Sequence, residues 1–244
     1  MKKIRKLTVV LVTFAVLCWV AASVQPACAT PIHYITPTGS STKDGPVNAE
    51  AFFTIDPASH HITLTLSDLL QNPKSDGQLI SGIMFVVSGT VSGSVTTANS
   101  GKVSNISNGG SYTTAVSDPL IRWKASSSGT TIYLTTLSGG TPNRLIIGPD
   151  SAGGFNGVGL YNNANSSIIQ HNPSVLGSAT FDITVPWLTA TSTLSNVYFK
   201  FGTVNDKTTD VVQGVHTPLP STVLLFGSGI LGVGLLGWRR RERS

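Results

Sequence analysis

The chain has 244 residues, of which 40% are hydrophobic and 11% are charged, and its formal net charge is +5. That charge lies at the two ends, because residues 1–29 hold four Lys or Arg and no acid, and residues 218–244 hold four Arg and one Glu. The segment between them carries eight Lys or Arg against ten Asp or Glu, which excludes the basic surface that nucleic-acid binding requires.

Residues 1–29 have the pattern of a secretory signal peptide. Met1 to Lys6 is cationic, Leu7 to Val20 is almost entirely apolar, and Ala27 and Ala29 are the small residues that a signal peptidase needs at its cleavage site. We therefore expect residues 30–47 to be an extended segment at the start of the mature protein.

Both cysteines of the chain, Cys18 and Cys28, precede the expected cleavage site. The mature protein then has no disulfide and depends on its hydrophobic core alone. A lipoprotein acylated on Cys28 is an alternative, but Gln25 stands where an apolar residue is expected.

Between the two ends, the hydrophobic pattern is typical of β-strands, and no run has a helical period. We expect residues 48–205 to form one antiparallel β-sandwich or jelly roll, followed by a linker over 206–217. The predicted strands are 50–55, 60–66, 80–87, 120–125, 131–137, 144–147, 180–185 and 197–201. The predicted large core residues are Trp123, Tyr133, Phe181, Trp187 and Phe199.

The last segment, residues 218–244, contains three features in a fixed order: Pro218-Leu219-Pro220, an uncharged apolar run over 223–238, and the cluster of Arg239, Arg240 and Arg241. As a helix the apolar run is about 24 Å long, slightly shorter than the ~30 Å hydrocarbon core of a bilayer. We expect it to cross the membrane with the arginines on the cytoplasmic side.

This order of features resembles the PEP-CTERM sorting signal in its Pro-Leu-Pro variant, with Leu219 in place of the glutamate of the motif. The resemblance implies a Gram-negative, exopolysaccharide-producing bacterium and an exosortase that processes the tail. It also implies a path through the inner membrane to the cell surface or extracellular matrix. Residues 48–205 likewise resemble a group of extracellular PEP-CTERM proteins that have no assigned activity.

Two other readings of the tail stay open. Leu219-Pro220-Ser221-Thr222 matches four positions of a sortase signal, although Val223 replaces the glycine. The tail could also remain as an uncleaved membrane anchor. All three readings place the folded region outside the cell.

The folded region offers no catalytic constellation in its sequence. Its ten carboxylates are scattered, mostly in predicted turns, and no pair is placed for glycoside hydrolysis. We expect solvated carboxylates, with Asp182 on the outward face of its strand, no enzyme activity and no cofactor.

Three weaker patterns concern binding. Asn205, Asp206 and Asp210 offer oxygen ligands for calcium in one loop, and Asp150 and Asn156 do so in another. The adjacent residues His60 and His61 should point to opposite faces of a strand and not share a metal. Tyr112 and Tyr161 are candidates for stacking on carbohydrate.

The sequence thus predicts an exported surface or matrix protein with a structural or adhesive role, linked to exopolysaccharide or biofilm. Two alternatives are a carbohydrate-binding module and an extracellular polysaccharide hydrolase.

Overall fold

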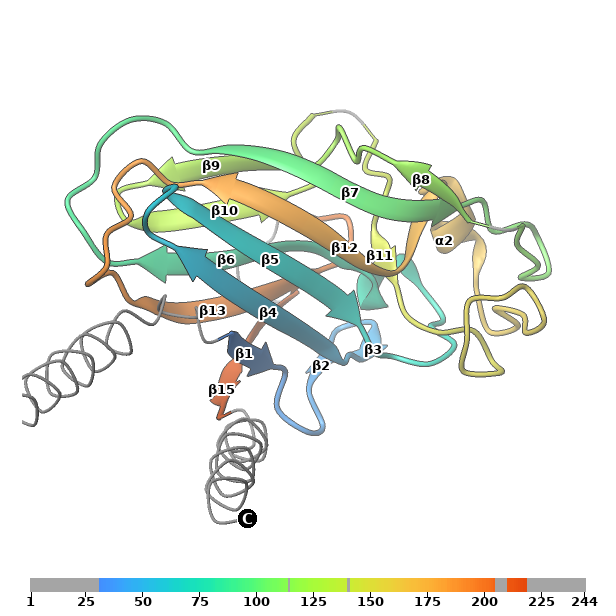
Figure 1. Ribbon diagram of the computed structural model, residues 1–244. Coiled ribbons are helices and arrows are strands. Elements are labelled where there is room, and N and C mark those ends of the chain that lie inside the picture. Colours follow the sequence, from blue (N-terminus) through green and yellow to red (C-terminus); the bar gives the residue numbers. More distant parts are fainter. Residues whose placement is uncertain (1–30, 114, 140, 205–209, 219–244) are drawn as a thin grey trace, which may run out of the picture. The chain divides into compact units, whose positions relative to one another are not determined.

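The computed structural model describes residues 31–113, 115–139, 141–204 and 210–218, and these form an all-β structure, as the sequence predicts (Figure 1). The main sheet has 13 strands: β1 (Ile32–Ile35), β4 (Ala49–Asp56), β5 (His61–Asp68), β6 (Ile80–Val87), β7 (Thr96–Ser104), β8 (Val116–Asp118), β9 (Lys124–Ser128), β10 (Thr131–Thr135), β11 (Ile146–Ile147), β12 (Ser174–Thr184), β13 (Leu194–Phe201), β14 (Val211–Gln213) and β15 (Val215–Thr217). A small hairpin, β2 (Ser41–Thr42) and β3 (Gly45–Pro46), and two single turns of helix, η1 (Asp76–Gln78) and α2 (Ser166–Gln170), complete the described elements.

The sheet folds back on itself into two layers. The first layer has the strand order β8-β7-β12-β5-β4-β1-β15, and the second has the order β14-β13-β6-β10-β9. Strand β11 joins them at one end, since it pairs in parallel with β12 and antiparallel with β6. Figure 1 shows β4, β5 and β12 crossing in front of β6 and β13.

Aromatic side chains fill the space between the layers. The ring of Phe53 in β4 lies 5.1 Å from that of Phe85 in β6, and the rings of Trp123 and Phe181 are 4.9 Å apart. All four side chains are fully buried. The two layers therefore share one apolar core.

The predicted core residues are confirmed except for Tyr133. Trp123, Phe181, Trp187 and Phe199 are buried, whereas Tyr133 is half-buried. Its neighbours Ile132 and Leu134 point into the core, so the alternation of a strand turns Tyr133 to the outer face of the second layer.

The strand predictions differ from the structure in several places: β8 was not predicted, and Arg144, at the start of the predicted strand over 144–147, has φ of 59° and precedes β11. Leu120 has φ of 48° and belongs to a turn, so the predicted strand over 120–125 is wrong, and β9 begins only at Lys124. Strand β7 lacks an alternating apolar pattern and was not predicted. It is held by its pairing with β12 over nearly its whole length.

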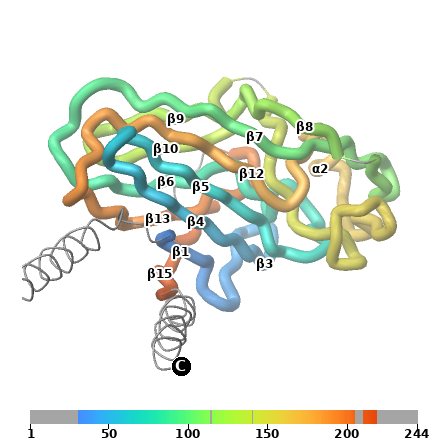
Figure 2. The backbone as a smooth tube through the Cα atoms, viewed as in Figure 1, coloured from blue at the N-terminus to red at the C-terminus, as the bar shows by residue number. Residues whose placement is uncertain are grey.

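The sheet also continues beyond the predicted bounds of 48–205. Strand β1 comes from the segment predicted as extended, and β14 and β15 come from the predicted linker. Figure 2 shows β1 and β15 side by side, and they pair antiparallel, with His33 opposite Thr217. These strands are too short to show a period, and their positions depend on partners distant in sequence.

The predicted signal peptide over 1–29 and the apolar run over 223–238 lie outside the described residues. Among the residues that are described, no helix is long and apolar enough to cross a bilayer.

Candidate functional site

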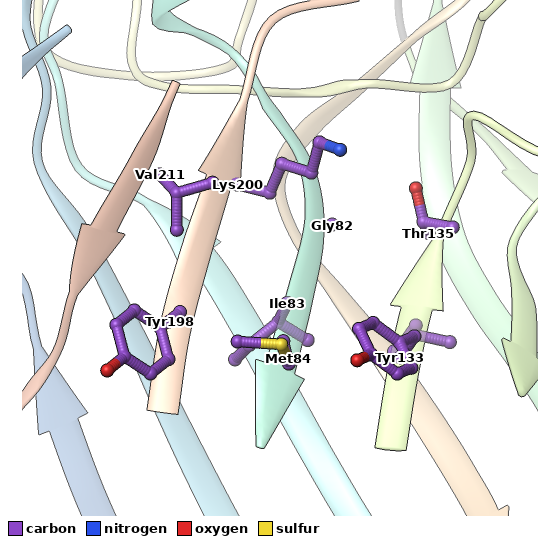
Figure 3. Close-up of a pocket in the computed structure, with 9 residues that line it drawn as sticks. Gly82, Ile83, Met84, Tyr133, Thr135, Tyr198, Lys200 and Val211 are labelled. Carbon is purple, nitrogen blue, oxygen red and sulfur yellow. The ribbon is translucent and has the colours of Figure 1, made fainter. Parts of the chain in front are cut away.

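The outer face of the second layer carries a row of large side chains that crosses three strands. Met84 of β6 is in register with Tyr198 of β13 on one side and with Tyr133 of β10 on the other. Figure 3 shows the two tyrosines on either side of Met84. All three side chains are half-buried, so their positions are restricted while part of each surface stays open to solvent.

A parallel row lies next to the first one. It runs from Val211 through Lys200, Gly82 and Thr135 to Lys124, each residue in register with the next. A Cβ on Gly82 would lie 2.9 Å from the carbonyl oxygen of Leu134, so this position excludes any side chain. The missing side chain leaves a hollow of about 170 Å³ between the two rows.

The composition of this face is distinct from that of the folded region as a whole. The strands β6, β9, β10, β13 and β14 contain Lys124 and Lys200 and no Asp or Glu. Hydroxyl side chains, including Thr135 and Ser126, stand beside the tyrosines. The arrangement combines aromatic rings, hydrogen-bonding groups and positive charge on one surface, which suits a ligand with apolar faces and polar edges.

Of the two tyrosines proposed from sequence for carbohydrate stacking, Tyr161 is not available for it, whereas Tyr112 is half-buried. Tyr161 is fully buried, its hydroxyl donates a hydrogen bond to the carbonyl of Gly148 at 2.9 Å, and burial raises the pKa of this tyrosine. The hydroxyl of Tyr112 donates to Asp150 at 2.6 Å and accepts from the N–H of Gly157. The sequence prediction was wrong for Tyr161, because Gly- and Asn-rich loops can fold over an aromatic ring and cover it.

The expectation that the carboxylates are solvated is wrong for Asp68, Asp150 and Asp210, which are all buried. Burial raises the pKa of Asp150, but hydrogen bonds from the Tyr112 hydroxyl and from backbone N–H groups outweigh it, and the pKa is lower than usual. Burial raises the pKa of Asp68 well above its usual value despite a hydrogen bond from the N–H of Leu70. Asp182 does point outward, as predicted, with 48% of its side chain exposed.

The oxygen ligands predicted for calcium in the loop of Asp150 and Asn156 already accept hydrogen bonds, whereas the other predicted calcium loop is described only at Asp210, whose Oδ1 has no hydrogen-bond partner among the described residues. The carboxylate of Asp150 is occupied by N–H and O–H donors, and the side chain of Asn156 accepts from the N–H of Val158. The ammonium of Lys43 lies 3.3 Å from the carboxylate of Asp210. The other two predicted ligands, Asn205 and Asp206, lie outside the described residues.

The two adjacent histidines diverge, but only His61 lies on a strand, because His60 has a φ of 59° in the turn before β5. His60 contacts the carbonyl of Leu188 through Nδ1 at 2.9 Å, whereas His61 pairs with Asp182 at 2.7 Å. In the ranges between residues 31 and 218 that the structure describes, no three His, Cys, Asp or Glu side chains form a group that could hold a metal ion.

The folded region ends next to the predicted sorting signal. Strand β15 ends at Thr217, and Pro218 follows directly. The other predicted residues of the signal, namely Leu219, Pro220, Arg239, Arg240 and Arg241, lie outside the described residues, as do Ala27 and Ala29.

Comparison with known protein families identifies the tail. Residues 216–241 match the PEP-CTERM protein-sorting motif. The chain therefore carries a sorting motif that directs proteins through export to the cell surface. This is consistent with a PEP-CTERM protein that is processed by an exosortase, which is a membrane enzyme. No curated protein and no solved structure matches the chain.

Proposed function

We propose that this chain is a structural or adhesive protein of the cell surface or extracellular matrix, linked to exopolysaccharide or biofilm. The observation that carries the proposal is the PEP-CTERM motif over 216–241, which begins within the last strand of an all-β domain. A domain joined so closely to a sorting motif is the part that export delivers. It reaches the surface as a β-sandwich held by its own core.

A second candidate function is carbohydrate binding within the same location. The observation that favours it is the row of Tyr198, Met84 and Tyr133 beside a hollow, with lysines and hydroxyls in the next row. An extracellular polysaccharide hydrolase is the third candidate. It would be recognised by release of reducing ends from a polysaccharide, which a binding module does not cause.

Localisation in a host that encodes an exosortase tests the first proposal. The chain, followed by an antibody against the folded domain, should be found on the cell surface or in the matrix, and biofilm mass should fall when its gene is deleted. In a strain without the exosortase, the chain should accumulate at the inner membrane as a precursor. A chain that stays at the inner membrane in both strains would contradict the proposal.

Substitutions in the tail distinguish processing by an exosortase from processing by a sortase. Pro218 and Pro220 favour an extended stretch that an enzyme can grip, so replacing both with alanine should leave the precursor unprocessed. Thr222→Ala should impair processing less than the double proline variant does. A sortase attacks the threonine carbonyl, so it would not process the Thr222→Ala chain. Intact mass of the mature protein is the measurement: a C-terminus at Thr222 joined to peptidoglycan would establish the sortase route, and one at Ser244 would establish a plain anchor.

A further inference from the structure

The chain contains two Asn-Gly pairs, Asn108-Gly109 and Asn156-Gly157, and both lie in described loops. An asparagine followed by glycine can modify itself, because the backbone nitrogen of the glycine can attack the side-chain carbonyl carbon of the asparagine. Glycine has no side chain to block this approach. The reaction requires that neither group is held elsewhere, and the two pairs differ in this respect.

Both reacting groups of Asn156-Gly157 are engaged in hydrogen bonds. The side-chain oxygen of Asn156 accepts from the N–H of Val158 at 3.0 Å. The N–H of Gly157, whose nitrogen would have to attack, donates to the hydroxyl of Tyr112 at 3.0 Å. That hydroxyl in turn donates to the buried carboxylate of Asp150 at 2.6 Å. Attack would break two of these contacts, so we expect this pair to be stable.

The reacting groups of Asn108-Gly109 are not held in this way. Both residues are exposed, in a turn that Gly110 closes by donating to the carbonyl of Ser107 at 2.9 Å. Among the described residues, neither the side-chain amide of Asn108 nor the N–H of Gly109 has a hydrogen-bond partner. In Figure 1 this turn belongs to the loop that leaves the end of β7 and projects from the sheet. The pair is therefore open to water and free to react.

The same turn has no room for a longer backbone. The N–H of Ser107 donates to the carbonyl of Ser111 at 2.8 Å, and the carbonyl of Gly110 accepts from the N–H of Tyr161 at 2.9 Å. A Cβ on Gly110 would lie 2.3 Å from the carbonyl oxygen of Tyr161. An extra backbone carbon between residues 108 and 109 would displace Gly110 and break these hydrogen bonds.

We propose that Asn108 converts itself to isoaspartate without an enzyme, and that this modification opens the turn that packs on Tyr161. The nitrogen of Gly109 bonds to Cγ of Asn108, the bond from Cγ to the side-chain nitrogen breaks, and ammonia leaves with the proton of the attacking nitrogen. Water then opens the cyclic imide. Addition of water at the main-chain carbonyl routes the backbone through Cγ and leaves a new carboxylate, whereas addition at Cγ gives ordinary aspartate. The inference does not depend on the proposed function.

The experiment uses the full chain in detergent, incubated in mildly alkaline buffer, because base removes the proton from the attacking nitrogen. Peptide mapping by mass spectrometry detects conversion as a gain of about 1 Da, and electron-transfer fragmentation distinguishes isoaspartate from aspartate. Asn108 should convert about tenfold faster than Asn156, since conversion of Asn156 must first break two hydrogen bonds.

Three controls separate the effect of structure from that of sequence. In urea both pairs should convert at similar rates, because unfolding removes the hydrogen bonds of Asn156 and Gly157. Asn108→Gln keeps the amide but needs a larger ring, so conversion at this position should fall at least ~tenfold. Tyr112→Phe removes the hydroxyl that accepts from Gly157, and it should speed conversion of Asn156 about threefold.

Hydrogen exchange measures the effect on the turn. After conversion of Asn108, the amides of residues 107–111 and of Tyr161 should exchange faster. Asn108→Asp carries the new charge on an ordinary backbone, and it should leave this exchange unchanged.

Two sets of results would overturn the inference. No conversion at Asn108, or equal rates at Asn108 and Asn156 in the folded chain, would overturn the assignment of the site. Conversion without faster exchange at Tyr161, or equally fast exchange in the Asn108→Asp variant, would overturn the opening of the turn by a longer backbone.

Discussion

Ionisation of the buried Asp68 carboxyl destabilises the folded state. Its side chain is buried at the end of β5, one carboxylate oxygen accepts from the N–H of Leu70, and the other has no hydrogen-bond partner among the described residues. Burial raises the pKa of this carboxyl well above its usual value. Asp118 is the opposite case, because hydrogen bonds from Arg144 at 2.9 and 3.0 Å lower its pKa.

Asp68→Asn should make the free energy of unfolding less dependent on pH. Above the unfolded-state pKa of ~3.9, the unfolded chain has lost the proton that folded Asp68 keeps, so the wild type loses stability as pH rises toward the raised pKa. The gain of the variant over the wild type should therefore grow with pH, by up to ~1.4 kcal/mol per pH unit. Urea unfolding at several pH values between 4 and 8 measures it.

Asp118→Asn is a control variant, for which the change in stability should have the opposite sign. The lowered pKa of Asp118 contributes stability above its unfolded-state pKa, and this is lost as pH falls through the folded-state pKa. This variant should be less stable than the wild type at pH 7, with a difference that shrinks in acid. Parallel pH profiles for the two variants would contradict the assignment of Asp68 as a protonated, buried group.

Gly148 marks a close approach of two backbone segments. A Cβ there would lie 2.1 Å from the carbonyl oxygen of Leu70, whereas a Cβ on Gly154 meets no heavy atom nearer than 3.9 Å. Gly148→Ala should therefore destabilise the domain by about 3 kcal/mol or more, and Gly154→Ala by less than ~1 kcal/mol. Thermal melts of the two variants provide the comparison, and equal melting temperatures would show that the segment near Leu70 moves freely.

At the scale of elements, the edge formed by β1 and β15 connects the fold to the sorting motif. The motif begins at residue 216, inside β15, and β15 pairs over three residues with β1 as its only partner in the described sheet. Val215 and His216 are exposed. A short edge strand with few buried contacts opens at low cost, so a membrane enzyme could take up this segment without unfolding the two layers.

Hydrogen exchange tests this property of β15. Amides of Val215 to Thr217 should exchange much faster than those of Ile62 to Leu66 in β5, which pairs on both sides and has three fully buried side chains. Mass spectrometry after peptic digestion resolves the two segments. Equal protection would mean that β15 opens only with the whole domain, and processing would then need global unfolding.

At the scale of the whole molecule, short strands from both ends complete the sheet. Tyr34 of β1 is buried and its ring meets that of Phe53, while Val212 of β14 packs against the core. The turn at Gly214 carries the chain from the second layer to the first, so close to the Phe199 ring that a Cβ would lie 2.9 Å from it. The ends of the folded region are thus part of its core.

A fragment of residues 31–218 should unfold in one cooperative transition, unaffected by reductant because it contains no cysteine. A fragment of residues 45–205 lacks β1, β2, β14 and β15 and should melt at least ~5 °C lower, since it exposes part of the shared core. Circular dichroism should show β structure in both fragments. Two separate transitions in the longer fragment would mean that the layers do not fold together.

The sequence alone determined the features that depend on local pattern. The order of proline element, apolar run and arginines identified the sorting motif, because such a signal is read as a linear segment. Alternation along 180–185 and 197–201 predicted strands that the structure has in β12 and β13, since side chains on a strand alternate between core and solvent.

Only the tertiary structure decided which residues share a surface. Tyr133 was predicted as a core residue, and Tyr161 was predicted as exposed beside a Gly- and Asn-rich loop. Packing of Ile132 and Leu134 into the core turned Tyr133 outward, and closure of the loop around Tyr161 buried that ring. The row of Tyr198, Met84 and Tyr133 depends on strand register between segments up to 114 residues apart, which no local pattern records. The same dependence on distant partners explains why β1, β14 and β15 were predicted as segments outside the sheet.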